Sequence, residues 1–227
     1  MRASAAGAAL FLLLPVAGCG GGGAGSLSPQ EALDQAWTTL VDTSGVSFTL
    51  TTDAIPDGTV GLLSADGVLN KSPAFEGEFS VPIGGFEPTI KVIAVDDVVY
   101  AQLPLTPGWQ QIEPSDYGVP DPARLIDGET GIASFLPATT EVSEGEQTRG
   151  GVDNKDILTV YTGIVPGDSV ASVISSATGD FDVDYTISDS GVLSEAVITG
   201  DFYGTGEDTT YTATISDYGS NPEITAP

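Results

Sequence analysis

Apolar and polar residues alternate along most of this chain, and this period of two constrains the fold more than any other feature. In the segment VSFTLTTD, the apolar residues Val46, Phe48 and Leu50 alternate with serine and threonine. Such alternation is typical of a strand with one buried and one solvated face. Nine further segments share it: residues 59–69, 74–81, 89–95, 98–103, 141–148, 153–164, 180–188, 193–202 and 209–216. The sequence therefore predicts about ten strands.

Short turns and a few helical segments complete the predicted fold. Asp66-Gly67 and Asp96-Asp97 indicate tight turns, so neighbouring strands are expected to be antiparallel. Ser28, Pro29 and Glu31 have the spacing of a helix start, and two further helical insertions follow residues 121 and 166. We therefore expect an α+β fold, a strongly curved antiparallel sheet of about ten strands covered by helices, as a single domain over residues 28–227.

A curved sheet under loosely packed helices leaves an apolar cavity, which is a usual place for a small molecule. The candidate cavity residues alternate along the strands or lie in the first helical insertion: Phe48, Leu50, Phe79, Val81, Ile90, Val92, Ala94, Val99, Ala101, Leu103, Ile126, Ile132, Phe135 and Leu136. For each of them the alternative is an ordinary place in a filled core, because periodicity does not separate a filled interior from a hollow one.

The N-terminal residues predict export and lipidation. Arg2, an apolar run over residues 8–16 and small residues before Cys19 form a secretory signal that is too short to span a membrane. The stretch VAGC resembles a bacterial lipobox, in which the cysteine is linked to diacylglycerol and the cut falls before it. The alternative is a secretory signal followed by an incidental cysteine. We expect a signal peptide over residues 1–18, a lipid anchor and glycine-rich tether over 19–27, and a location on the outer face of the cell membrane.

Charge and missing residue types narrow the function. With 32 acidic and 6 basic residues the net charge is −26, which excludes nucleic acid as a partner and leaves lipid as the means of reaching the membrane. The chain has no histidine and one cysteine, so a serine–histidine triad and a zinc cluster are excluded. We expect that the protein is not an enzyme and uses neither a cofactor nor a metal. The alternative of a glycoside hydrolase with paired carboxylates is the weakest of three hypotheses; the other two are a lipid carrier and an envelope scaffold or sensor.

One acidic motif superficially resembles the start of a calcium loop. In DFDVDY, Asp180, Asp182 and Asp184 alternate with apolar residues, but the sixth position is Tyr185, where a calcium loop needs glycine. We expect instead a strand whose aspartates face solvent.

Four stretches carry a resemblance to a known family: IKVIAVDDVVYAQL (90–103), PGWQQI (107–112), DPARLIDGETGIASFL (121–136) and TYTATISDYGSNPEITAP (210–227). In this order and spacing the chain resembles the LppX/LprA/LprF/LprG lipoproteins of mycobacteria and related actinobacteria. The resemblance implies a half-barrel fold like that of LolA and LolB. It also implies that the chain binds acyl chains of glycolipids, lipoglycans or triacylglycerols and carries them through the cell envelope, alongside a major-facilitator exporter.

Two points remain open at the level of sequence. The chain is more acidic than the resemblance suggests, so an anionic lipoglycan would be repelled unless Lys71, Lys91, Arg124 or Arg149 lay at the mouth of the cavity. The second hypothesis for function is an envelope scaffold or sensor with a filled core.

Overall fold

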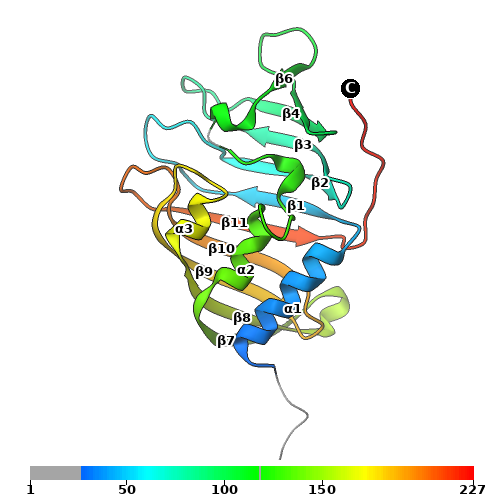
Figure 1. Cartoon of the computed structure of the whole chain (residues 1–227), viewed down its shortest axis with the longest axis vertical. Helices are drawn as coiled ribbons and strands as arrows, with labels where there is room; N and C mark the ends of the chain where they lie inside the picture. Colours follow the sequence, from blue (N-terminus) through cyan, green and yellow to red (C-terminus); the bar gives the residue numbers. More distant parts are fainter. Residues whose placement is uncertain (1–26, 118) are drawn as a thin grey trace, which may run out of the picture.

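The computed structural model describes residues 27–117 and 119–227. The predicted signal peptide and Cys19 lie outside the described residues. Eleven strands form one open antiparallel sheet in the order β6-β5-β4-β3-β2-β1-β11-β10-β9-β8-β7 (Figure 1). Their bounds are β1 Gly45–Thr51, β2 Ser64–Asn70, β3 Ala74–Ser80, β4 Thr89–Val95, β5 Val98–Ala101, β6 Gln110–Ile112, β7 Thr140–Gly150, β8 Asp156–Val165, β9 Thr178–Ser188, β10 Leu193–Asp201 and β11 Thr209–Ser216.

The sheet is built from two meanders that meet at its centre. Strands β1 to β6 form one meander, β7 to β11 form the other, and β1 pairs with β11. In this central pair Phe48 lies opposite Ile215. Because β6 and β7 form the two edges and do not pair with each other, the sheet is a half-barrel and not a closed barrel.

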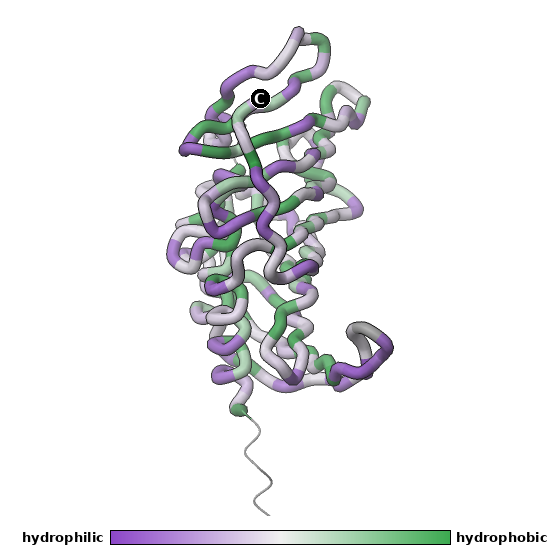
Figure 2. Tube along the Cα trace, turned by 90° about the vertical axis from the view of Figure 1, so that its right-hand side faces the viewer, coloured by the Kyte–Doolittle hydropathy of each residue, from purple (hydrophilic) through white to green (hydrophobic). Residues whose placement is uncertain are grey.

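The short helical elements lie on one face of the sheet, as the edge-on view shows (Figure 2). They are α1 Pro29–Asp42, α2 Phe135–Ala138, α3 Gly167–Ala171 and the 3-10 turns η1 Pro114–Tyr117, η2 Pro122–Arg124 and η3 Ile132–Ser134; a further turn, η4 Val152–Asn154, joins β7 to β8. We call the segment from η1 to α2, residues 113–139, the cover. Helix α1 begins as predicted, because Ser28 accepts the Glu31 amide while the Glu31 carboxylate accepts the Ser28 amide.

The main core lies between the sheet and these helices. It is formed by the inward-facing residues of nearly all strands and the apolar side of α1, with Leu33, Leu40, Phe75, Phe135 and Phe181 among the largest fully buried side chains. The sheet, this core and the cap of α1 all lie within residues 27–227.

A smaller core lies on the other face of the sheet, under the C-terminal segment. Ile224 packs there against Ala74 and Ile93, and the Asn70 side-chain amide donates to the Pro222 carbonyl at 3.2 Å. The residues after β11 thus pack against the outer face of strands β2, β3 and β4. In Figure 1 they run past the ends of these strands, on the right.

The structure corrects the predicted strand pattern at several points. The strand expected at 59–69 begins only at Ser64, because the residues before it form a loop. Asp66-Gly67 is not a turn: Gly67 lies inside β2, opposite Phe48 on one side and Gly77 on the other. Strand β6 was not predicted, because its three residues Gln110–Ile112 are too few to show alternation.

The DFDVDY motif is confirmed as a strand with a solvated face. Within β9, Asp180, Asp182 and Asp184 are exposed while Phe181 and Val183 are buried. No helix in the part of the chain that the structure describes is long and apolar enough to cross a membrane.

Candidate functional site

An apolar pocket lies between the centre of the sheet and the cover, and we call it the central pocket. Its volume is about 110 Å³. Strands β1, β2, β3, β10 and β11 form its floor, and the cover forms most of its roof. The lining residues are Phe48, Leu50, Leu62, Ala65, Phe79, Val119, Pro120, Pro122, Leu125, Ile132, Phe135, Ile174, Ile198, Phe202, Tyr203, Tyr211 and Ala213.

A second and larger apolar pocket lies toward the β6 end of the sheet, and we call it the end pocket. Its volume is about 570 Å³, within the range of about 300–1,000 Å³ usual for small-molecule sites. Strands β3, β4 and β5 form its floor, with three loops and η1 around it. The lining residues are Val60, Gly61, Leu62, Phe79, Val81, Pro82, Ile83, Gly84, Ile90, Val92, Val99, Ala101, Leu103, Ile112, Pro114, Asp116, Tyr117, Val119 and Pro122.

The two pockets share part of their walls. Leu62, Phe79, Val119 and Pro122 line both of them. Phe79 belongs to β3, whereas Val119 and Pro122 belong to the cover. The pockets are therefore neighbours along one apolar face, divided only by apolar side chains.

The sequence-predicted cavity residues divide into two groups. Eleven line one or both pockets: Phe48, Leu50, Phe79, Val81, Ile90, Val92, Val99, Ala101, Leu103, Ile132 and Phe135. The other three, Ala94, Ile126 and Leu136, are buried in the main core and line neither pocket. Whether any of these residues contacts a lipid stays a prediction.

Sequence reasoning missed part of both linings. Ile198, Tyr211 and Ala213 follow the same alternation within β10 and β11 as the residues that were selected, so that signal could have found them. Leu62 and Val119 lie in loops, and Pro122 begins the short turn η2. Loop residues have no period, so the sequence held no comparable signal for them.

The polar atoms at the floor of the central pocket are bonded to one another. The Tyr203 and Tyr211 hydroxyls form a short hydrogen bond, and the Tyr211 hydroxyl donates to the Leu62 carbonyl at 2.6 Å. Burial raises the pKa of both tyrosines above its usual value. Both side chains are therefore neutral at physiological pH, and their hydroxyls are engaged within the protein.

Two contacts fix the cover to the sheet. The Thr139 hydroxyl donates to the Phe135 carbonyl at 2.7 Å and lies 3.2 Å from the buried Tyr185 hydroxyl of β9. Near the middle of the cover, in η2, the Arg124 guanidinium donates to the Asp97 carboxylate at 2.6 Å, in the turn between β4 and β5. The roof is thus held over the pockets at two points.

Charge is unevenly placed around the pockets. None of the described lysines or arginines lines either apolar pocket, and Asp116 is the one charged residue in the two linings. A polar pocket of about 410 Å³ adjoins them through Val119, and its lining includes Asp97, Glu113 and Asp121. The site therefore offers an apolar interior with acidic surroundings.

The structural class of this chain is an open half-barrel with apolar pockets under a helical cover. The chain belongs to the LppX_LprAFG lipoprotein family, whose model matches residues 28–224. This match confirms the family resemblance seen in the sequence.

Solved structures share the fold. LprF from Mycobacterium bovis matches with a TM-score of 0.69 and 14% identity over 89% of this chain and 99% of that chain. LppX from Mycobacterium tuberculosis matches with a TM-score of 0.64 and 16% identity over 87% of this chain and 98% of that chain. No curated protein matches the sequence at a significant level.

Proposed function

We propose that this chain is a membrane-anchored lipoprotein that binds lipid acyl chains in the central and end pockets and carries the lipid across the cell envelope. The observation that carries the proposal is the pair of adjoining apolar pockets between sheet and cover. An acyl chain gains about 0.8 kcal/mol for each methylene removed from water. A chain of about 16 carbons thus gains on the order of 10 kcal/mol before the ordering costs of binding.

The surroundings of the pockets favour a lipid with an uncharged headgroup. An anionic headgroup would need a lysine or arginine at the mouth, and among the described residues none lines the apolar pockets. In the adjoining polar pocket it would meet the carboxylates of Asp97, Glu113 and Asp121. Arg124 forms ion pairs with Asp97 and Asp121 and so neutralises part of this negative charge. Triacylglycerols and uncharged glycolipids therefore fit better than an anionic lipoglycan.

Anchoring and partners are part of the same proposal. Cys19 would carry the lipid anchor, and the glycine-rich residues after it would let the domain move over the membrane surface. A major-facilitator exporter would be the source or the acceptor of the lipid. Membership of a lipoprotein family supports the assignment of the lipid anchor.

A matched pair of substitutions tests binding in the end pocket. Ala101 and Ala94 are both buried on neighbouring strands, but only Ala101 lines this pocket. We expect the longer side chain of Ala101→Leu to enter the hollow and lower the fraction of lipid-bound protein several-fold, at a smaller cost in stability than Ala94→Leu. Ala94→Leu should instead overpack the core and cost about 1–3 kcal/mol while leaving the lipid-bound fraction unchanged.

The measurements are native mass spectrometry of residues 27–227 after gentle purification, and urea unfolding of each variant. Co-purified lipid in the wild type that is reduced in Ala101→Leu supports the proposal. A lipid-free mass for the wild type even after incubation with triacylglycerol and glycolipid would contradict it, and would favour the scaffold or sensor hypothesis.

A further inference from the structure

Large apolar side chains that stay exposed gather at the mouth of the end pocket. Val60, Ile83 and Tyr117 line that pocket and are 64, 52 and 42% exposed, and Phe86, bonded to Ile83, is 78% exposed. We call these four residues the apolar rim. Single exposed apolar residues are common on protein surfaces, but a group of them around an opening indicates a contact surface.

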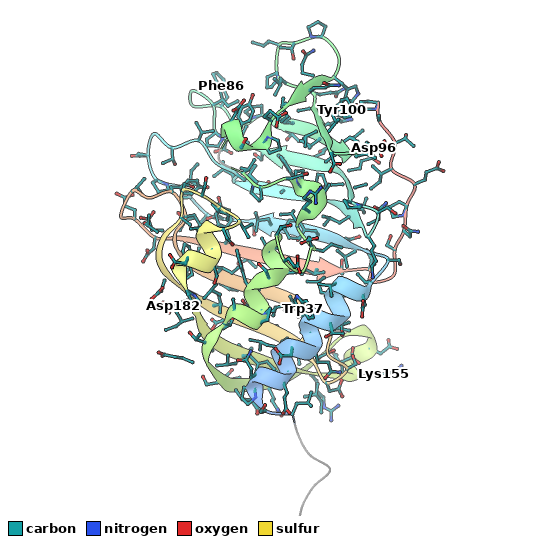
Figure 3. All side chains as sticks on the ribbon, viewed as in Figure 1. Trp37, Phe86, Asp96, Tyr100, Lys155 and Asp182 are labelled. Carbon is teal, nitrogen blue, oxygen red and sulfur yellow. The ribbon has the colours of Figure 1, made fainter. Side chains whose placement is uncertain are left out.

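The backbone holds part of the rim in place. Ile83 and Phe86 exchange two backbone hydrogen bonds of 2.8 and 3.0 Å across Gly84-Gly85. Both glycines have positive φ, 58° and 85°, which is the conformation of a tight hairpin turn. This turn presents Phe86 outward from the β3–β4 loop, as Figure 3 shows.

The loop between β5 and β6 adds a fifth exposed residue. Leu105 is fully exposed and has a positive φ of 65°, a conformation that bulky side chains rarely adopt. Two residues earlier, Leu103 lines the end pocket. Leu105 is therefore fully exposed, with a strained backbone, in a loop that borders the mouth of the end pocket.

We propose that the apolar rim and Leu105 dock on the surface of a lipid bilayer and bring the mouth of the end pocket against it. The side chains project from several separate loops around an opening, an arrangement that a bilayer accommodates by partial insertion of each side chain. A lipid could then pass between bilayer and pocket without exposing its acyl chains to water. This inference rests on the proposed function.

The charges around the rim specify the kind of bilayer. Residues 52–63, 81–88, 102–109 and 113–117, which form the loops and turn at this end, contain no lysine or arginine. They contain acidic residues beside the rim, including Asp57, Glu87 and Asp116. The docking surface is therefore suited to uncharged or zwitterionic headgroups, and anionic lipids would repel it.

Vesicle flotation of the domain formed by residues 27–227 tests the proposal. We expect it to bind phosphatidylcholine vesicles, and Phe86→Ser combined with Leu105→Ser, neither of which lines a pocket, to weaken binding at least about tenfold. The matched control is Ile157→Ser, because Ile157 is 38% exposed on β8 at the other end of the sheet; it should bind like the wild type. Adding phosphatidylglycerol should weaken binding at low salt, and NaCl should restore it.

Several results would overturn the proposal. They are wild-type protein that does not float with the vesicles, rim variants that bind as well as the wild type, and binding that anionic lipid strengthens. A rim-dependent dimer seen by light scattering, without vesicle binding, would make the rim a contact between copies of the chain.

Native mass spectrometry of the same variants separates this proposal from the proposed function. Rim variants that keep bound lipid but lose vesicle binding support docking as a separate role. Rim-dependent vesicle binding by a protein that never holds lipid would support docking while contradicting lipid carriage.

Discussion

Buried tyrosine hydroxyls in this domain each have a defined partner. The Tyr211 hydroxyl donates to the Leu62 carbonyl, the Tyr218 hydroxyl donates to the Leu193 carbonyl, and the Tyr185 hydroxyl meets Thr139. Burial raises the pKa of all three tyrosines, so they act as neutral donors over the physiological range. A buried polar group that loses its partner costs more than the hydrogen bond itself contributes. The loss of stability should therefore depend on which partner of a hydrogen bond is removed, because only some substitutions leave a buried polar group without a partner.

The pair of Thr139 and Tyr185 shows this asymmetry. In Thr139→Val the Tyr185 hydroxyl stays buried without a partner, and we expect a loss of about 1–3 kcal/mol in the free energy of unfolding. In Tyr185→Phe the Thr139 hydroxyl still donates to the Phe135 carbonyl, so the loss should be no more than about 1 kcal/mol. Urea unfolding of both variants and the double variant measures the difference. Equal losses in the two single variants would contradict the prediction.

Asp201 should make stability depend on pH. Its carboxylate is buried, and it accepts hydrogen bonds from the Tyr203, Thr205 and Gly206 amides and the Thr178 hydroxyl. Burial by itself would raise the pKa of Asp201, but the hydrogen bonds outweigh burial and lower it. A lowered pKa in the folded state stabilises the fold above the unfolded pKa of about 3.9, and this contribution is lost as pH falls through the folded pKa.

We therefore expect Asp201→Asn to cost about 1–3 kcal/mol at pH 7, because the amide group of asparagine would face N–H donors. The difference in unfolding free energy between variant and wild type should shrink as the pH falls below about 4, because the wild-type protein then loses the contribution of the charged carboxylate. Unfolding in urea at neutral and acid pH measures the gap. A gap that does not change with pH would show that the carboxylate charge is not responsible.

Strands β2 and β3 are shaped by a pair of glycines that face each other. Gly67 lies opposite Gly77, and a Cβ atom at either position would meet the Phe75 ring and a backbone carbonyl of the opposite strand. The Phe75 ring thus occupies the space that two side chains would need. This arrangement lets the two strands and the ring pack closely under the wall between the pockets, where Phe79 lies 5.5 Å from Phe75 between ring centroids.

Gly77→Ala should therefore disturb the sheet strongly. The new methyl group would collide with the Asp66 carbonyl and the Phe75 ring, and we expect a loss of more than about 3 kcal/mol or failure to fold. The matched control is Gly145→Ala in strand β7, where the nearest atom would be 3.2 Å away. Thermal melting should show a large decrease for the first variant and a small one for the second. Similar melting temperatures would contradict the account of the glycine pair.

The elements differ in how far the sequence predicted them. Strand β4 (Thr89–Val95) and strand β11 (Thr209–Ser216) were predicted to the residue, because alternation runs their full length between clear turns. Gly67 was read as part of a turn because glycine after aspartate usually marks one, and only its neighbour strands show why it lies in β2. For the site, alternation selected the floor of the pockets, but Val119 and Pro122 in the roof have no such pattern. Their position depends on contacts distant in sequence.

At the scale of the whole molecule, unbalanced negative charge opposes folding. The net charge is −26, and the ion pairs among the described residues join Lys71, Arg124 and Lys155 to aspartates that are exposed or, in the case of Asp121, half-buried. Such exposed pairs contribute little to stability, so salt that screens them should lower the stability only slightly. Screening the repulsion among many acidic groups should gain more.

We therefore expect the melting temperature to rise when NaCl is added at neutral pH, and the rise to become smaller as the carboxylates are protonated near pH 4. Differential scanning calorimetry over a salt series at both pH values measures this effect. A melting temperature that falls with salt at neutral pH would mean that attractive pairs outweigh the repulsion.

The pairing of β1 with β11 has a consequence for biogenesis. The first and the last strand of the sheet in chain order become adjacent partners, with Phe48 beside Ile215. Until residues 209–216 have been made, two separate meanders each present an unpaired edge where they will later join. A chain of this topology completes its sheet only after its final strand is available. For the export that we propose, this delay would let the chain thread through a secretion channel as an extended polypeptide and assemble its sheet on the far side of the membrane.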